Sequence, residues 1–165
     1  MEIDMYSVGD KVVHPMHGAG IIEGIRRIEI AGNKKSYYAV KFAVGSMTTN
    51  IPIENSDSIG LRNLIGKDEA REVVERFIQM PISKDINWNK RQRDNLLKIK
   101  SGDIYKVLEV LKDLMYRDKT KGLSTNERKT LGSAKQIVMS ELVLSGFASQ
   151  SDIESIMNDT IEALI

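Results

Sequence analysis

The sequence of 165 residues contains no cysteine, a single tryptophan and almost no net charge. The absence of cysteine excludes disulfide bonds, thiol nucleophiles, zinc–thiolate sites and iron–sulfur clusters. Lysine and arginine total 24 against 23 acidic residues, which disfavours a protein that coats nucleic acid by bulk charge. Hydrophobic residues at 41% and charged residues at 28% are typical of a globular chain rather than a disordered one.

Long hydrophobic segments are also missing. No stretch approaches the roughly 18 uninterrupted apolar residues of a membrane-spanning helix. The first residues, Met1 to Met5, lack the basic start and the apolar run of a secretory signal. We therefore expect a soluble, cytoplasmic protein.

The residue types that carry catalysis or metal binding are sparse. His14 and His17 are the only histidines, and two ligands do not make a zinc site without a third. The nearby glycines fail the dinucleotide-binding fingerprint, and no βαβ pattern surrounds them. No nucleophile-and-base arrangement can be read from the spacing of the serines and lysines. We predict a non-enzymatic protein with no metal site and no cofactor.

The first 58 residues have the pattern of short β-strands. Alternating apolar residues are divided by turn sequences near residues 9–10, 14–20, 31–35 and 45–46, and Pro52 ends the last run. The run 21–30 contains Gly24, where we expect a bend. Four or five short strands in so little chain indicate a small, strongly bent antiparallel barrel.

The period changes to that of helices in the second half. Apolar spacing predicts helices over 61–78, 87–100, 103–118, 124–145 and 151–164. Capping boxes are expected at Ser124 with Glu127, and at Ser151 with Glu154. The predicted fold is α+β, with a small antiparallel β-barrel at 1–58 and a compact all-α bundle of about five helices at 59–165.

Charge is segregated along the chain although the total is close to zero. Residues 84–100 carry six basic and two acidic side chains, and residues 117–140 carry the same numbers. Residues 141–165 carry five acidic side chains and no basic one. These segments are either solvated helix faces that balance one another, or a polarised bundle that turns one face to phosphates.

The single tryptophan, Trp88, stands at the expected start of a helix, with Asn87 as a plausible N-cap. Its side of that helix is mostly polar and is shared by Arg91, Gln92, Asn95 and Ile99. Trp88 is either a lid over the edge of the bundle or an exposed aromatic among cations. The exposed arrangement suits nucleic acid, because a flat side chain can wedge against bases while basic neighbours hold phosphates.

Five segments, in this order along the chain, resemble the CarD/CdnL family of bacterial transcription regulators. They are Val8–Gly20 (VGDKVVHPMHGAG), Ile51–Asn55 (IPIEN), Asn87–Arg91 (NWNKR), Lys100–Asp103 (KSGD) and Arg117–Ser124 (RDKTKGLS). The resemblance covers essentially the whole chain. It implies that the N-terminal domain is Tudor-like and binds the β subunit of RNA polymerase, with strand edges meeting at the contact.

The resemblance also bears on which residues meet the polymerase. Some family members have arginines where this sequence has Ile28 and Asn50. The contact is therefore expected to involve Arg26 and Arg27 together with Ile28, Asn50 and Ile51.

For the helical domain, the resemblance implies contact with promoter DNA at the upstream edge of the melted bubble. Trp88 takes the place of the minor-groove wedge, and Lys90 and Arg93 contact the DNA backbone, with Arg91 as their neighbour. Such a wedge lengthens the life of the open promoter complex without making or breaking a bond. We expect a monomer located at the nucleoid through the polymerase. The alternative is a protein–protein adaptor on RNA polymerase, whose helical domain binds another protein through Trp88.

Overall fold

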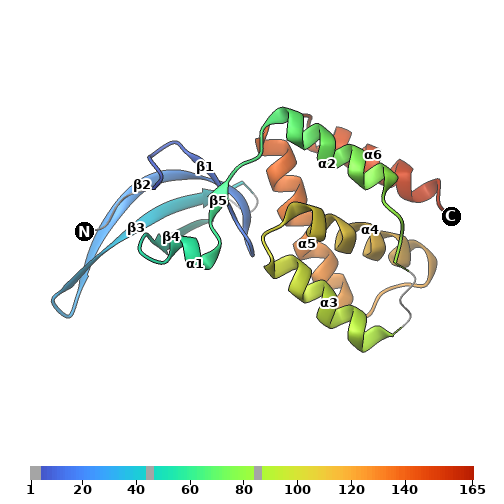
Figure 1. Ribbon diagram of the computed structural model, residues 1–165, viewed down its shortest axis with the longest axis horizontal. Helices are drawn as coiled ribbons and strands as arrows, with labels where there is room; N and C mark the ends of the chain where they lie inside the picture. The colour runs from blue at the N-terminus through green and yellow to red at the C-terminus, as the bar shows by residue number, and fades with distance from the viewer. Residues whose placement is uncertain (1–4, 44–46, 84–86) are drawn as a thin grey trace.

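The computed structural model describes residues 5–43, 47–83 and 87–165. Its strands are β1 (Lys11–His14), β2 (Gly18–Ile30), β3 (Asn33–Phe42), β4 (Thr48–Pro52) and β5 (Arg62–Asn63). Its helices are α1 (Ser56–Ile59), α2 (Lys67–Gln79), α3 (Trp88–Lys100), α4 (Ile104–Thr120), α5 (Thr125–Leu144) and α6 (Gln150–Glu162). The sheet lies at one end of the molecule and helices α2 to α6 at the other (Figure 1). The predicted α+β class is confirmed.

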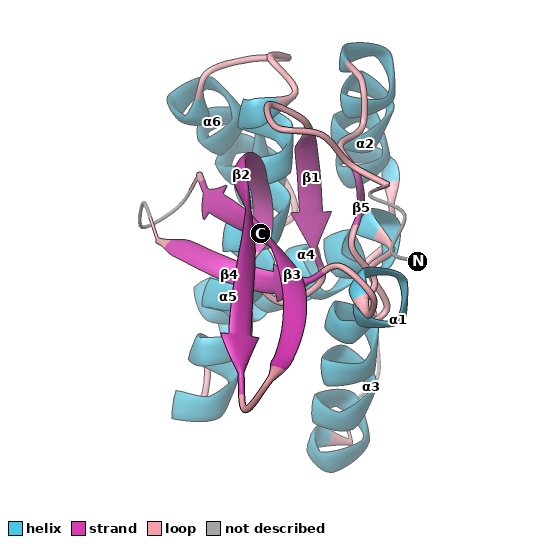
Figure 2. Ribbon diagram, turned by 90° about the vertical axis from the view of Figure 1, so that its left-hand side faces the viewer, coloured by secondary structure: helices cyan, strands magenta, loops and turns pink. Residues whose placement is uncertain are grey.

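The strands form one antiparallel sheet in the order β4-β3-β2-β1-β5. Figure 2 shows the curved strands in front of the helices. The predicted barrel is not closed among the described residues, since β4 and β5 lie at opposite edges of the sheet. Closure requires the two edge strands to pair with each other, and here the full width of the sheet separates them.

The long β2–β3 hairpin extends beyond the rest of the sheet. Its tight turn is formed by Ala31 and Gly32, both with positive φ (51° and 81°), the geometry of a two-residue hairpin loop. The pairing register shifts between Ile22 and Gly24, where a bend was expected. Because β1 pairs only with Gly18–Ile21, the outer half of β2 has β3 as its single strand neighbour among the described residues.

Two separate apolar cores lie beneath these elements. The sheet core gathers buried residues of β1 to β4 around Tyr38, Val40 and Phe42. The helical core gathers the inward faces of α2 to α6, including Phe77 and Leu111. Leu61, which was expected to begin a helix, instead packs in the sheet core, and the helix begins at Lys67.

The helices of the C-terminal half begin at side-chain caps in most cases. Ser124 Oγ accepts the backbone N–H of Glu127, so the first predicted cap is confirmed. The second prediction is wrong in position. Ser149, not Ser151, caps α6 by accepting the N–H of Asp152, because the chain turns into the helix two residues earlier.

One buried lysine closes the C-terminal end of α2. Lys112 in α4 is 1% exposed, and its ammonium donates to the carbonyl oxygens of Phe77 (2.6 Å), Ile78 (3.2 Å) and Met80 (2.6 Å). The last carbonyls of a helix have no partner within it, so Lys112 satisfies groups that would otherwise be buried without one. Burial lowers the pKa of this ammonium.

The predicted division after residue 58 stays a prediction. The two cores agree with a two-part chain, but β5 lies beyond residue 58 and pairs with β1 through Arg62 and Asn63. Within the described ranges, no helix is long and apolar enough to cross a membrane.

Candidate nucleic-acid interface

The N-terminal turn of α3 presents Trp88 at the edge of the helical bundle. Asn87 lies just before the helix, and its Oδ1 accepts the backbone N–H of Lys90 at 3.1 Å. This cap fixes the first turn, from which the Trp88 side chain projects. Trp88 is 42% exposed, so its indole is neither fully covered nor free of the protein surface.

The indole is held by a buried carboxylate of α5. Trp88 Nε1 donates to Glu127 Oε1 at 3.0 Å, while Arg91 Nε and Nη2 donate to Glu127 Oε2 at 3.2 and 3.1 Å. The Glu127 and Arg91 side chains are only 6% and 10% exposed. One carboxylate therefore pins the tryptophan and neutralises the adjacent guanidinium, and it is itself positioned by the Ser124 cap.

The predicted DNA-contacting residues fall into two groups. Trp88, Lys90 and Arg93 are exposed, and neither Lys90 nor Arg93 has an ion pair among the described residues. Arg91 differs, since its guanidinium is buried against Glu127. The structure therefore brings Arg91 to the site as a support beneath Trp88, with its charge already paired.

The second basic segment, 117–140, is partly neutralised. Three of its cations form ion pairs: Arg128 with Asp118 at 3.3 Å, Lys119 with Glu162 at 3.6 Å, and Lys135 with Glu154 at 3.5 Å. Two of these acids belong to α6, so the acidic C-terminal helix lies against the basic segment rather than apart from it. Lys129 of α5 is exposed and unpaired within the described part of the chain.

The sequence could not predict that Lys129 is unpaired, because the sum of charges over a segment does not distinguish paired from unpaired cations. It lies two positions beyond Glu127, which contacts Trp88. Gln92 Nε2 of α3 donates to Thr130 Oγ1 of α5 at 3.3 Å, so the two helices run side by side past this point. Residues two apart on a helix point to different sides, so Lys129 lies off the side of α5 that meets Trp88 and α3.

The residues predicted to meet the polymerase lie on two faces of the sheet. Paired residues of an antiparallel sheet point to the same face, and residues alternate along a strand. Arg26, Ile28 and Asn50 pair with alternate residues of β3, namely Tyr37 (with Arg26), Lys35 (with Ile28) and Ala39 (with Asn50). Arg26, Ile28 and Asn50 therefore share the outer face of the sheet.

Arg27 and Ile51 occupy the opposite, core-side face. Arg27 Nη1 donates to the hydroxyl of buried Ser36 at 2.7 Å, although the arginine itself is exposed. Ile51 is 3% exposed and packs in the sheet core. Its side chain is thus committed to the fold, while its backbone lies in the edge strand β4.

His14 ends β1, and His17 lies in the connection to β2. Their ring centroids are 4.6 Å apart, and both rings approach Phe42. Burial and the neighbouring His17 lower the pKa of His14 to about 4. The described residues contain no cluster of three or more potential histidine or carboxylate metal ligands.

Comparisons with known proteins identify relatives of this chain. The family described as "CarD-like/TRCF RID domain" matches residues 6–65, and "CarD, C-terminal domain" matches residues 72–158. "Putative transcription factor YdeB" of Bacillus subtilis (strain 168) is 33% identical over 151 residues, which cover 92% of this chain and 99% of that protein. The solved structure of "CdnLNt from Myxoccoccus xanthus" is 37% identical and covers 39% of this chain and 90% of its own, with a TM-score of 0.33. The chain belongs to the CarD/CdnL family of transcription regulators.

Proposed function

We propose that this chain binds the β subunit of RNA polymerase through its sheet and lengthens the life of the promoter open complex through α3. The observation that carries the proposal is the state of Trp88. Trp88 is 42% exposed and its indole is fixed by Glu127, while Lys90 and Arg93 are exposed on the same helix. No step of this proposal makes or breaks a covalent bond.

A fixed indole is suited to act as a wedge. A free side chain would lose rotamer freedom on entering DNA, whereas the hydrogen bond from Nε1 to Glu127 holds Trp88 in place beforehand. An apolar ring inserted at a base step unstacks it and disfavours reannealing of the strands. Trp88 therefore acts at the upstream edge of the bubble, where duplex meets melted DNA.

The exposed cations around Trp88 hold the DNA backbone. Lys90 and Arg93 supply two phosphate contacts from α3. Arg91 acts on DNA indirectly, because its guanidinium is paired with Glu127 and supports the indole. So few contacts give weak binding to free DNA, which agrees with a net charge of only +1.

The polymerase supplies the missing affinity through the sheet. Strand β4 is an edge strand whose outward backbone groups are available to pair with a strand of the β subunit. Asn50 lies in that edge strand, and Arg26 and Ile28 lie on the same outer face in β2, on the other side of β3. We assign the specificity of the contact to these three residues. In this arrangement the chain acts as a monomer that reaches the nucleoid with the polymerase.

The salt dependence of binding to forked promoter DNA in the presence of polymerase tests the DNA assignment. The slope of log K against log salt becomes more negative by about 0.9 for each phosphate contact in B-DNA. Lys90→Glu and Arg93→Glu should each weaken binding and flatten this slope, with unchanged affinity for the β subunit. Lys106→Glu, an exposed position on α4, is the control. An unchanged slope in both variants contradicts the phosphate contacts.

A protein–protein adaptor is the second candidate, because α3 also exposes apolar residues. Leu97 is 68% exposed and Leu96 is 40% exposed, and such residues serve as anchors in protein interfaces. The two candidates give opposite results in the same assay. Binding to the forked DNA that does not depend on salt, or no binding in the presence of polymerase, favours the adaptor.

A further inference from the structure

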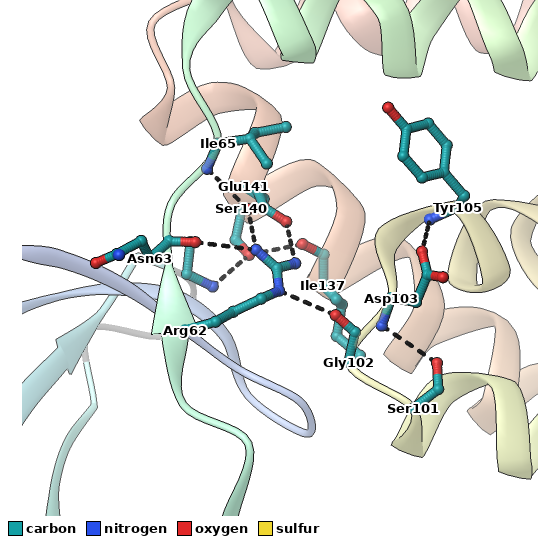
Figure 3. A network of polar contacts seen from close by, with 11 residues as sticks. Arg62, Asn63, Ile65, Ser101, Gly102, Asp103, Tyr105, Ile137, Ser140 and Glu141 are labelled. Carbon is teal, nitrogen blue, oxygen red and sulfur yellow. Dashed lines mark hydrogen bonds and ion pairs between the residues drawn. The ribbon is translucent and has the colours of Figure 1, made fainter. Parts of the chain in front are cut away.

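A buried ion pair joins the sheet to the helical bundle. Arg62 of β5 and Glu141 of α5 meet in a two-pronged contact, with Nη1 donating to Oε2 at 2.7 Å and Nη2 to Oε1 at 2.6 Å (Figure 3). Glu141 is completely buried, and the Arg62 side chain is 29% exposed. A planar guanidinium facing a carboxylate in this way fixes the relative orientation of both groups as well as their distance.

The same two side chains tie down two further segments. Glu141 Oε2 also accepts the backbone N–H of Ile65 at 3.2 Å, in the connection that leads to α2. Arg62 Nε donates to the carbonyl of Gly102 at 2.9 Å, in the turn between α3 and α4. The pair therefore connects the sheet, the connecting segment, α5 and the end of α3.

A second contact lies one residue away on α5. The backbone N–H of Ala19 in β2 donates to Ser140 Oγ at 2.9 Å. Gly18 lies so close to α5 that an added Cβ would overlap Ser140 Oγ and stand 3.3 Å from the Cα of Ile137. The start of β2 thus rests directly on the helix.

Helix α5 connects this junction with the tryptophan. Glu141 lies near its C-terminal end, and Glu127, which holds Trp88 and Arg91, lies in its first turn. Fourteen residues of α-helix span about 21 Å. A single helix therefore carries both the carboxylate that receives the sheet and the carboxylate that receives the indole.

We propose that the Arg62–Glu141 pair is a positioning device that fixes Trp88 at a set distance and angle from the polymerase-binding sheet. This inference rests on the proposed function. A DNA-contacting surface with few cations gains most from being delivered in the correct orientation, because a flexible link would spread Trp88 over many positions. Arg62 and Glu141 contact neither partner, and they act through the placement of α5.

The test uses the full chain and two variants. The first replaces both charges, Arg62→Met with Glu141→Met, because exchanging a buried ion pair for apolar residues usually preserves the fold. The second, Ser140→Ala, removes only the hydroxyl that receives Ala19. The control is Glu109→Gln, which breaks a solvent-exposed ion pair with Lys98 on the surface of the helical bundle.

Domain orientation is measured first, without polymerase or DNA. The sequence has no cysteine, so Lys34→Cys in the hairpin and Leu97→Cys on α3 accept two nitroxide labels and no others. Pulsed electron spin resonance should give one narrow distance distribution in the parent chain and in the control. It should give a broader or shifted distribution in the double variant, and a smaller change with Ser140→Ala. A broad distribution in the parent overturns the inference.

Open-complex lifetime is measured next on the unlabelled proteins at saturating concentration. The lifetime extension given by the double variant should be at least about fivefold smaller than that given by the parent, in the range of typical coupling effects. The concentration for half-maximal effect should stay the same, because the polymerase contact is intact. A distance distribution with the width and centre of the parent, or an undiminished lifetime, in both junction variants overturns the positioning role. A parent chain that does not extend the lifetime at all overturns the proposed function, whatever the spin-label distances show.

Discussion

Replacing Glu127 with glutamine removes the charge that holds Trp88 and Arg91 while keeping the shape of the side chain. Glutamine offers one acceptor oxygen, and its NH₂ group faces donors where the second carboxylate oxygen stood. Trp88 Nε1 at 3.0 Å and the two Arg91 donors at 3.2 and 3.1 Å cannot all be satisfied by that oxygen. The perturbation is therefore confined to one buried cluster.

The size of the effect follows from burial. The Arg91 and Glu127 side chains are 10% and 6% exposed, so water does not replace the lost partner. Breaking a buried pair by removing one partner costs about 3–5 kcal/mol. Since glutamine keeps one acceptor, we expect the lower end, about 3 kcal/mol. For a domain of this size that is a fall in Tm of roughly 6–12 °C.

Two measurements follow the change. Thermal unfolding by circular dichroism gives the loss of stability. Fluorescence reports on the indole directly, because Trp88 is the single tryptophan of the chain. Its emission should shift to longer wavelength in Glu127→Gln, since the released ring becomes more solvated. Open-complex lifetime should fall in the same variant.

The control is Glu109→Gln, whose ion pair with Lys98 is exposed. Exposed pairs contribute between zero and about 1 kcal/mol, so this variant should keep the Tm and the emission of the parent. If Glu127→Gln behaves like Glu109→Gln in both measurements, the carboxylate does not hold the indole and the reasoning is refuted.

Three further perturbations probe the rest of the fold. Lys112→Met should lower the free energy of unfolding, measured by chemical denaturation, by about 2 kcal/mol, because the last carbonyls of α2 lose their donor. The control Lys106→Met, at an exposed position, should change it little, and equal stabilities of the two variants contradict the capping role. The free energy of unfolding should fall as the pH drops from about 6.5 towards 4, because the pKa of His14 is about 4 in the folded chain and the unfolded chain takes up the proton first. His14→Asn should flatten this part of the stability–pH profile. A profile unchanged in that variant shows that His14 is not the cause. Gly18→Ala should destabilise more than Gly32→Ala, since both glycines have φ near +80° but only Gly18 faces Ser140; equal losses of Tm show that β2 does not rest tightly on α5.

Much of the helical half could be predicted from the sequence. The apolar spacing and the cap at Ser124 are local signals, and α3, α4 and α5 lie close to the predicted ranges. Strand β5 could not be found in this way, because two residues carry no periodicity. Its position depends on Arg62 meeting a carboxylate 79 residues away.

Trp88 shows where helical periodicity stops being informative. The polar side of α3 that it borders is the buried side, since Arg91 and Asn95 face inward while Leu97 faces solvent. A helical wheel assigns burial to apolar residues and cannot anticipate that Glu127 receives the guanidinium of Arg91. The two interpretations of Trp88, a lid or an exposed aromatic, each describe part of a ring that is anchored at Nε1 and 42% exposed.

The charge pattern predicted which segments are basic or acidic, but it did not predict which charged residues form ion pairs with one another. The acidic C-terminal segment and the basic segment before it are real, but α6 places Glu154 and Glu162 on Lys135 and Lys119. Ion pairs between distant segments depend on packing that no segment sum contains. The unpaired cations that remain in segment 117–140 are therefore fewer than the sequence suggests.

The most direct test of the central claim is the lifetime of the open complex on one promoter with the parent chain, Trp88→Ala and Leu97→Ala. Leu97 is the matched control, an exposed apolar residue on the same helix. We expect Trp88→Ala to abolish most of the lifetime extension while β-subunit binding is retained, and Leu97→Ala to behave like the parent. A Trp88→Ala variant that stabilises the complex as well as the parent does would contradict it.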